Sequence, residues 1–162
     1  MALAGERETP MAKLRHIALA AEDPYATAEF YKKAFDFVEV RRTEPRGEGK
    51  SYGVFLSDGT ISLAVLRFGW DQGHGIEFRG IHHFGVLVDD VDRYVEKLEE
   101  LGAECFARRP PEVKTFYETK FHGPDRVVFD VTDHPWRGAA ALDASTAADA
   151  DLKPEAVAKA AP

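Results

Sequence analysis

The chain has 162 residues, of which 44% are hydrophobic and 30% charged, a composition typical of one globular domain or two small modules that share a core. Its net charge of −7, without a cluster of Lys and Arg, argues against nucleic acid as a partner, because phosphate binding needs concentrated positive charge. No apolar run is long enough to span a bilayer, and the single cysteine, Cys105, excludes an internal disulfide and a zinc site built from thiolates.

The first residues read as a leader followed by a folded unit. Residues 1–12 are charged and lack the apolar core of a secretion signal, which predicts a flexible leader and a cytoplasmic protein. An apolar strand is expected over 13–21. Asp23 is placed to cap a helix that runs to about position 35, since Pro24 suits the first turn and apolar residues recur at helical spacing. Three further strands are predicted over residues 37–43, 51–57 and 60–68.

The same order of elements returns after a glycine-rich linker. Four of the linker residues 69–80 are glycine, which favours a loop. A strand is expected directly after it, and Asp90 is placed to cap a helix that ends at Gly102. Three more strands are predicted over residues 103–108, 114–121 and 126–133. We therefore predict one domain over 13–136, made of two strand–helix–strand–strand–strand modules at residues 13–68 and 81–136.

Residues 137–162 are rich in Ala, Asp and Lys and poor in aromatic residues. So few apolar groups cannot offset the conformational entropy that is lost when a chain becomes ordered, and we predict a disordered tail. A nascent helix near 153–160 and folding of the tail onto a partner subunit are the alternatives.

Chemically distinctive residues recur at one interval along the two modules. His16 and His83 lie 67 positions apart, each inside an apolar strand. A repeat of this kind indicates two copies of one supersecondary unit that face each other, so residues at matching positions converge on a shared cleft. The same interval relates Leu63 to Asp130. The leucine cannot bind a metal, whereas the aspartate can.

Alternation of side chains along a strand predicts which way the histidines point. His16 and His83 each share a strand face with small residues, whereas bulky apolar residues fall mostly on the other face, which we expect to pack against the helices. The face with small residues leaves room for a ligand. His82 is predicted on the helix-packing side, although a β-bulge would exchange His82 and His83.

Two histidines and one carboxylate form the candidate site. Asp130 lies in a strand rich in Val and Phe, where a carboxylate is costly unless it is bound to a cation or paired, for example with an arginine. Neutral imidazole and carboxylate suit a divalent ion such as Fe, Mn, Zn, Ni or Co, and three ligands leave open positions for substrate or water. The sequence thus predicts a metal site formed by His16, His83 and Asp130.

Four segments resemble the vicinal oxygen chelate superfamily, namely HIALAAEDPYATAEFYKKAFDF, SDGTISLAVL, HFGVLVDDVDRYVEKLEELGAE and HGPDRVVFDV. This superfamily includes glyoxalase I, methylmalonyl-CoA epimerase, fosfomycin and bleomycin resistance proteins and extradiol dioxygenases. The resemblance implies an α+β fold in which two βαβββ modules form a curved, mostly antiparallel sheet around a cleft. It also implies a homodimer, and a metal between the modules held by His16, His83 and Asp130, with Leu63 at the position of a fourth ligand.

The leading hypothesis from the resemblance is an enzyme that binds a small substrate through vicinal oxygens on a divalent metal. A lyase or isomerase, an extradiol-type dioxygenase, and an enzyme that adds thiol or water all fit such a site. The acid–base candidates are Tyr117 and Glu118 on the seventh strand, of which only one can face the cleft, and His122 at its end. The alternative is a metal-free binding protein of the bleomycin-resistance type that sequesters an aromatic ligand.

Overall fold

The computed structural model describes residues 12–135, which contain two copies of one five-element unit, so the leader up to residue 11 and the predicted tail fall outside the described residues. The predicted order of elements is confirmed in both copies. The first copy consists of β1 (Lys13–Ala20), α1 (Pro24–Phe35), β2 (Val38–Thr43), β3 (Tyr52–Ser57) and β4 (Ser62–Arg67). The second consists of β5 (Gly80–Leu87), α2 (Val91–Glu100), β6 (Glu104–Ala107), β7 (Thr119–His122), a short 3-10 turn (Pro124–Arg126) and β8 (Val128–Thr132).

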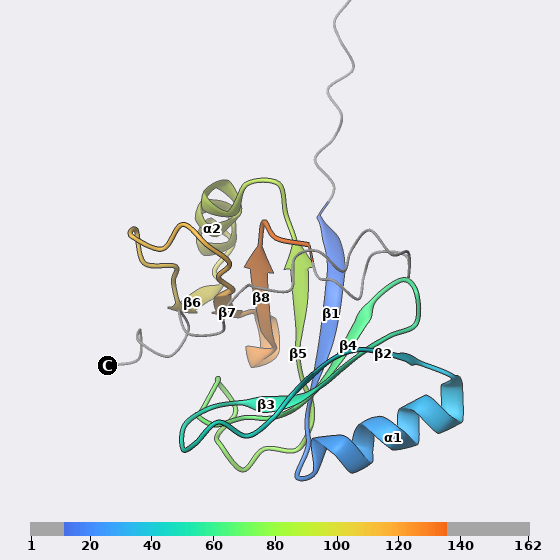
Figure 1. The fold of residues 1–162 in the computed structure, drawn as a ribbon. Coiled ribbons are helices and arrows are strands. Elements are labelled where there is room, and N and C mark those ends of the chain that lie inside the picture. The colour runs from blue at the N-terminus through green and yellow to red at the C-terminus, as the bar shows by residue number, and fades with distance from the viewer. Residues whose placement is uncertain (1–11, 136–162) are drawn as a thin grey trace, which may run out of the picture.

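The eight strands of the described chain form one open, curved sheet in the order β2-β3-β4-β1-β5-β8-β7-β6. β1 and β5 pair in antiparallel fashion at its centre, and each also pairs in parallel with the last strand of its own module. Figure 1 shows β1, β5 and β8 side by side, with α1 and α2 toward opposite ends of the molecule. The predicted α+β fold with a mostly antiparallel sheet is therefore confirmed, and the two modules meet along the β1–β5 seam.

Both helices begin at the aspartates that the sequence indicates. The carboxylate of Asp23 accepts hydrogen bonds from the backbone N–H groups of Tyr25 and Ala26, and that of Asp90 accepts one from the backbone N–H of Arg93. These contacts satisfy N–H groups that have no partner within the first turn of a helix. Each module therefore fixes its helix with a local signal placed directly after its first strand.

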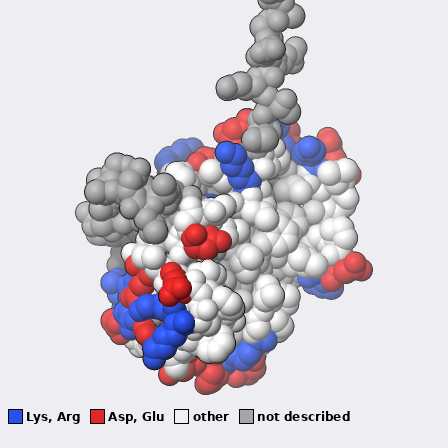
Figure 2. All heavy atoms as spheres, turned by 90° about the vertical axis from the view of Figure 1, so that its right-hand side faces the viewer, with Lys and Arg blue, Asp and Glu red and all other residues white. Residues whose placement is uncertain are grey.

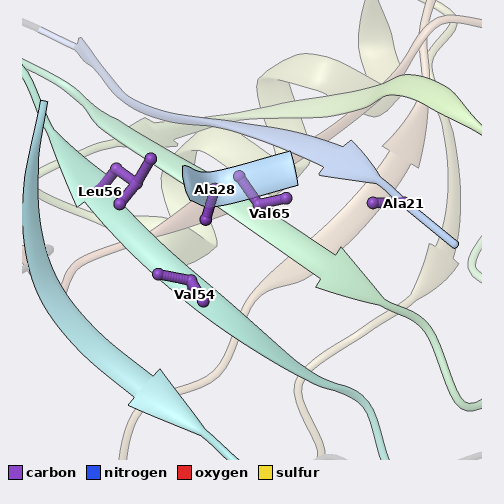
Figure 3. Packing of buried hydrophobic residues seen from close by; sticks show 5 residues of the cluster. All are labelled: Ala21, Ala28, Val54, Leu56 and Val65. Carbon is purple, nitrogen blue, oxygen red and sulfur yellow. The ribbon is translucent and has the colours of Figure 1, made fainter. Parts of the chain in front are cut away.

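Both helices lie on the same side of the sheet. In the first module, Val54, Leu56 and Val65 of β3 and β4 pack against Ala28 of α1 (Figure 3). In the second, valines of α2 pack against Phe121 of β7 and against β8. Because side chains alternate along a strand, the neighbouring residues of these strands point to the opposite face. That face carries the histidines, and the helices do not cover it.

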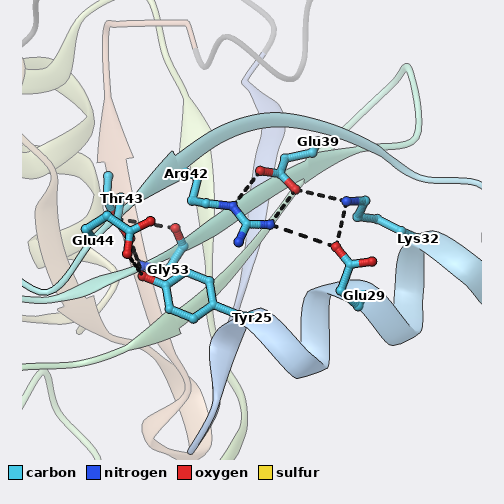
Figure 4. A network of polar contacts seen from close by, with 8 residues as sticks. All are labelled: Tyr25, Glu29, Lys32, Glu39, Arg42, Thr43, Glu44 and Gly53. Carbon is cyan, nitrogen blue, oxygen red and sulfur yellow. Dashed lines mark hydrogen bonds and ion pairs between the residues drawn. The ribbon is translucent and has the colours of Figure 1, made fainter.

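A group of ion pairs connects α1 to β2 at the edge of the sheet (Figure 4). The guanidinium of Arg42 donates to both carboxylate oxygens of Glu39, at 2.8 and 2.9 Å. The ammonium of Lys32 donates to Glu39 at 3.0 Å and to Glu29 at 2.7 Å. Each such exposed pair contributes little by itself, so the group positions β2 beside the helix rather than holding the fold together.

Figure 2 shows one face of the molecule, on which Lys, Arg, Asp and Glu gather mostly around the margins, with some acidic groups nearer the middle and uncharged residues over the rest. The basic groups visible there do not join into one continuous patch. Within residues 12–135, neither helix has the length and apolar character needed to cross a membrane.

The seventh strand is shorter than predicted. It spans Thr119–His122 instead of 114–121, because its partners end early: β6 has only four residues, and β8 stops at Thr132. The chain before Thr119 therefore has no strand on either side to pair with. Tyr117 and Glu118 do not lie on a strand, so the alternation that would place only one of them on the ligand face does not apply.

Candidate metal centre

Two β-bulges in the β1–β5 seam set the directions of the side chains around the candidate site. β1 carries the extra residue Arg15 directly before His16, and β5 carries the extra residue His82 directly before His83. At a bulge, two residues oppose one on the partner strand, so strict alternation is lost. Arg15 and His82 occupy the same place in the repeat, and the seam therefore brings a pair of adjacent side chains from each module toward the site.

The prediction that His82 packs on the helix side is wrong, and the bulge is the reason. His82 is buried, and its ring centroid lies 4.4 Å from that of Phe68, which packs with Ala18 and Ala64 on the face away from the helices. His82 Nδ1 lies 2.9 Å from His83 Nδ1. The bulge thus brings both histidines to the candidate site instead of exchanging them.

The three predicted ligands meet at the seam between the modules. His16 Nε2 lies 3.1 Å from His83 Nε2, and Asp130 Oδ2 lies 3.2 Å from His83 Nε2 and 3.7 Å from His16 Nε2. All three side chains are buried. Ligand atoms about 2.1 Å from one ion stand about 3.0–3.4 Å apart. Two of the three separations fall in this range and the 3.7 Å separation exceeds it by a few tenths of an ångström, so the three atoms can share a cation. Among residues 12–135, no other group of three or more His, Cys, Asp or Glu side chains converges in this way.

Two further observations favour a ligand at this position. Asp130 Oδ1 is buried and has no hydrogen-bond partner within the described part of the chain, which is costly for a carboxylate oxygen. Gly85, the partner of Asp130 across the β5–β8 pair, has no side chain, so His16 and Asp130 can approach each other next to its backbone. A Cβ at Gly85 would lie 2.2 Å from His16 Cε1 and 2.7 Å from Asp130 Oδ1. The donor set and the space around it therefore fit a divalent metal.

The charge states of the residues also suit a metal. Burial lowers the pKa of His16 to about 4, so the imidazole is neutral at pH 7, the form that ligates a cation. For Asp130, burial alone would raise the pKa, but the Lys120 ammonium and the two imidazoles outweigh it and hold that pKa below its usual range. The site thus presents a neutral imidazole and an ionised carboxylate, as metal binding requires.

The comparison with known families decides the classification. Residues 13–144 match the family model described as the Glyoxalase/Bleomycin resistance protein/Dioxygenase superfamily. The chain belongs to this superfamily. The resemblance noted in the sequence is thereby confirmed.

Several solved structures share the fold. A hypothetical protein from Bacillus halodurans superposes with a TM-score of 0.59 at 18% identity, covering 77% of this chain and 97% of that chain. A methylmalonyl-CoA epimerase variant from Streptomyces coelicolor, in complex with 2-nitronate-propionyl-CoA, gives 0.58 at 22% identity, covering 74% and 94%. The Mycobacterium tuberculosis methylmalonyl-CoA epimerase gives 0.54 at 19% identity, covering 73% and 85%. At these identities the likeness shows a common fold.

The position that corresponds to a fourth ligand is Ala64 rather than Leu63. Strand pairing sets Ala64 beside Ala18 and Asp130 beside Gly85, and Ala18 and Gly85 occupy the same place in the repeat. Leu63 instead packs into the core beneath α1. The second module is one residue shorter than the first before its last strand. In the first module, Ala64 rather than Leu63 therefore points to the face that carries the histidines. Neither Ala64 nor Leu63 can ligate, so the superfamily site of this chain has three candidate ligands.

Two buried cations beside these ligands were missed in the sequence. Lys120 is 3% exposed, and its Nζ lies 3.4 Å from Asp130 Oδ2 and 3.4 Å from Glu118 Oε2. Arg15 is 1% exposed and forms an ion pair with Glu118 Oε1. The repeat could have pointed to Arg15, because Arg15 directly precedes His16 just as His82 directly precedes His83. Lys120 becomes notable only once the β7–β8 pairing places it beside Asp130.

The structure places the three acid–base candidates differently. Glu118 lies beside the ligand set; burial would raise its pKa, but neighbouring Lys120 and Arg15 outweigh it and lower that pKa. Tyr117 is buried, which raises the pKa of its hydroxyl, and no ion pair or hydrogen bond within residues 12–135 connects it to the three ligands. His122 is buried at the far end of β7, where its Nε2 lies 3.4 Å from the carbonyl oxygen of Gly73 in the linker.

Proposed function

We propose that this protein is a metal-dependent enzyme of the superfamily, acting on a small substrate that binds through vicinal oxygen atoms. The observation that carries the proposal is the meeting of His16 Nε2, His83 Nε2 and Asp130 Oδ2 within 3.7 Å of one another at the seam. These three atoms would hold a divalent ion. When bound, the ion supplies Lewis-acid chemistry, polarising a substrate oxygen or making a hydroxyl more acidic.

Among the reaction types open to such a site, we favour proton transfer, as in an isomerase or a lyase. Glu118 is our candidate for the group that accepts a proton from a bound substrate, because Arg15 and Lys120 hold its carboxylate beside the ligand set. Burial raises the pKa of the Tyr117 hydroxyl, and no hydrogen bond or ion pair within residues 12–135 brings it to the ligand set, so we assign it no proton-transfer role. The epimerases among the structural neighbours support this choice, because epimerisation requires a proton to leave and return.

The test is metal binding by the full-length protein. We expect about one divalent ion per chain, measured by elemental analysis after dialysis and by competition with a chromophoric chelator. His83→Ala should remove that ion, whereas His134→Ala, which changes a side chain that is 33% exposed, should not. A protein that binds no ion, or binds it equally well without His83, would contradict the proposal.

The second candidate is the metal-free binding protein. It is favoured by the Lys120–Asp130 ion pair, which neutralises the carboxylate without a metal, and by Phe55, Phe68 and Phe78, which cluster on the candidate face. An aromatic ligand could stack there. Affinity for such a ligand that persists unchanged after treatment with a chelator, in a protein that takes up no ion, would support this candidate. The predicted homodimer and cytoplasmic location stay predictions from the sequence.

His82 offers a prediction about metal affinity. His83 faces the other two candidate ligands with Nε2, which leaves its Nδ1 to donate a hydrogen bond to His82 Nδ1 at 2.9 Å. His82→Phe keeps a ring but removes this acceptor, and we expect metal affinity to fall about 10- to 100-fold. His82→Asn should retain most of the affinity, because its amide oxygen stands near the position of Nδ1. Chelator competition measures both variants, and equal affinities for Phe and Asn would exclude this role.

A further inference from the structure

The candidate metal centre is bordered by four buried or nearly buried charges. Arg15 pairs with Glu118, and Lys120 lies between Glu118 and Asp130, at 3.4 Å from each carboxylate. The exposed fractions of the four side chains are 1%, 18%, 3% and 0%, in the order Arg15, Glu118, Lys120 and Asp130. Two positive and two negative charges cancel, so these four side chains carry no net charge before a cation binds.

A divalent cation would break this balance. It would add two positive charges to a buried region in which both carboxylates already have cationic partners. Uncompensated charge is costly where water is largely excluded. A bound ligand must then supply the missing negative charge, since Glu118 and Asp130 are the only carboxylates that the described chain brings to this group. The charge balance therefore favours an anionic ligand over a neutral one.

Lys120 is placed to contact that anion. Asp130 Oδ2 lies close to Lys120 Nζ and to both imidazole Nε2 atoms, so the ammonium borders the ligand set. An ammonium has three N–H donors, and the two acceptors of Lys120 within residues 12–135 both stand at 3.4 Å, which is long for a charged hydrogen bond. The ammonium can therefore turn toward a closer oxyanion without leaving a strong contact.

We propose that Lys120 is a specificity-determining residue that selects a substrate with a carboxylate group by binding that group together with the ion. This inference rests on the proposed function, because it requires a cation at His16, His83 and Asp130. A lysine that served only to neutralise Asp130 would act on protein stability and not on the charge of the ligand. The two roles differ in their effect on anion binding to the metal-loaded protein.

The experiment uses full-length protein loaded with Co²⁺ and oxalate, a dianion with vicinal oxygens, as the probe. Calorimetric titration should show that Lys120→Met binds oxalate roughly tenfold or more weakly than the wild type, because a charge-assisted contact is lost. Its cobalt affinity should stay equal or rise, since a neighbouring positive charge is removed. Lys114→Met, which changes an exposed lysine outside the site, is the matched control and should leave both affinities unchanged.

A second variant tests the opposite direction. Glu118→Gln removes one negative charge while Lys120 stays in place, so oxalate should bind more tightly, roughly threefold or more. The Glu118→Gln measurement still tests the inference if Lys120→Met fails to fold. If the folded variants bind cobalt and their oxalate affinity equals that of the wild type, the inference about Lys120 is wrong while the proposed function stands. A wild type that binds no cobalt would overturn the proposed function as well, and the initial cobalt titration separates these two results.

Discussion

Asp130→Asn is expected to lower metal affinity by more than about 100-fold. Removal of a residue that only hydrogen-bonds to a ligand costs about 10- to 100-fold, and removal of a ligand should cost more. The substitution keeps the shape of the side chain but removes the charge that lies 3.2 Å from His83 Nε2 and 3.4 Å from Lys120 Nζ. Lys120 would then be buried with a single partner. Breaking a buried ion pair from one side costs about 3–5 kcal/mol, so the free energy of unfolding should fall as well. Chelator competition and urea denaturation measure the two effects.

The matched control for this variant is Asp133→Asn. Asp133 lies just beyond β8, is 35% exposed and pairs with Arg109 at 3.6 Å, away from the ligand set. Its loss should change metal affinity little and the free energy of unfolding by less than about 1 kcal/mol. If Asp130→Asn lost stability but kept its metal, Asp130 would be a partner for Lys120 and not a ligand.

Gly85→Ala is expected to disable the site by filling it. The added Cβ would stand 2.2 Å from His16 Cε1, 2.3 Å from His16 Nδ1 and 2.7 Å from Asp130 Oδ1, distances that no packing tolerates. His16 and Asp130 would have to move, and overpacking of a buried site costs about 1–3 kcal/mol. We expect metal binding to be lost while the sheet remains formed, as measured by chelator competition and far-ultraviolet circular dichroism.

The repeat itself provides the control for Gly85→Ala. Ala18 occupies the corresponding position in the first module and is fully buried. Ala18→Gly is the reverse exchange, of alanine for glycine, on the neighbouring strand β1. It should lower the free energy of unfolding by about 0.5–1 kcal/mol through backbone entropy. Its metal affinity should match that of the wild type. Unimpaired metal binding in Gly85→Ala would show that the ion does not sit between His16 and Asp130.

The order of the elements could be predicted because each boundary has a local signal. Asp23 and Asp90 cap their helices within three residues, and the glycines of the linker separate the modules. The length of β7 could not be predicted in this way. It depends on where β6 and β8 end, and those are pairings between residues distant in sequence. The segment that carries Tyr117 therefore looked like a strand although it has no partner.

The ligand candidates could be named because their chemistry stands out at a fixed interval. The histidines recur in matching apolar strands, and Asp130 is a charge among Val and Phe. The directions of His82 and Leu63 could not be read in the same way, because each depends on a single residue added in a bulge or a loop. A shift of one residue moves a strand side chain to the other face. The role of Lys120 required the pairing of β7 with β8.

The β1–β5 seam has a consequence for how fast the protein is degraded in a cell. One ligand comes from the first module and two from the second, so an occupying ion would act as a clasp across the only strand pair that joins them in the described chain. A ligand present at 100 times its Kd, and bound only by the folded state, adds about 2.7 kcal/mol of stability. Chains without the ion would open along this seam more often and be cut sooner by proteases. The abundance of the protein in a cell would then follow the supply of its metal.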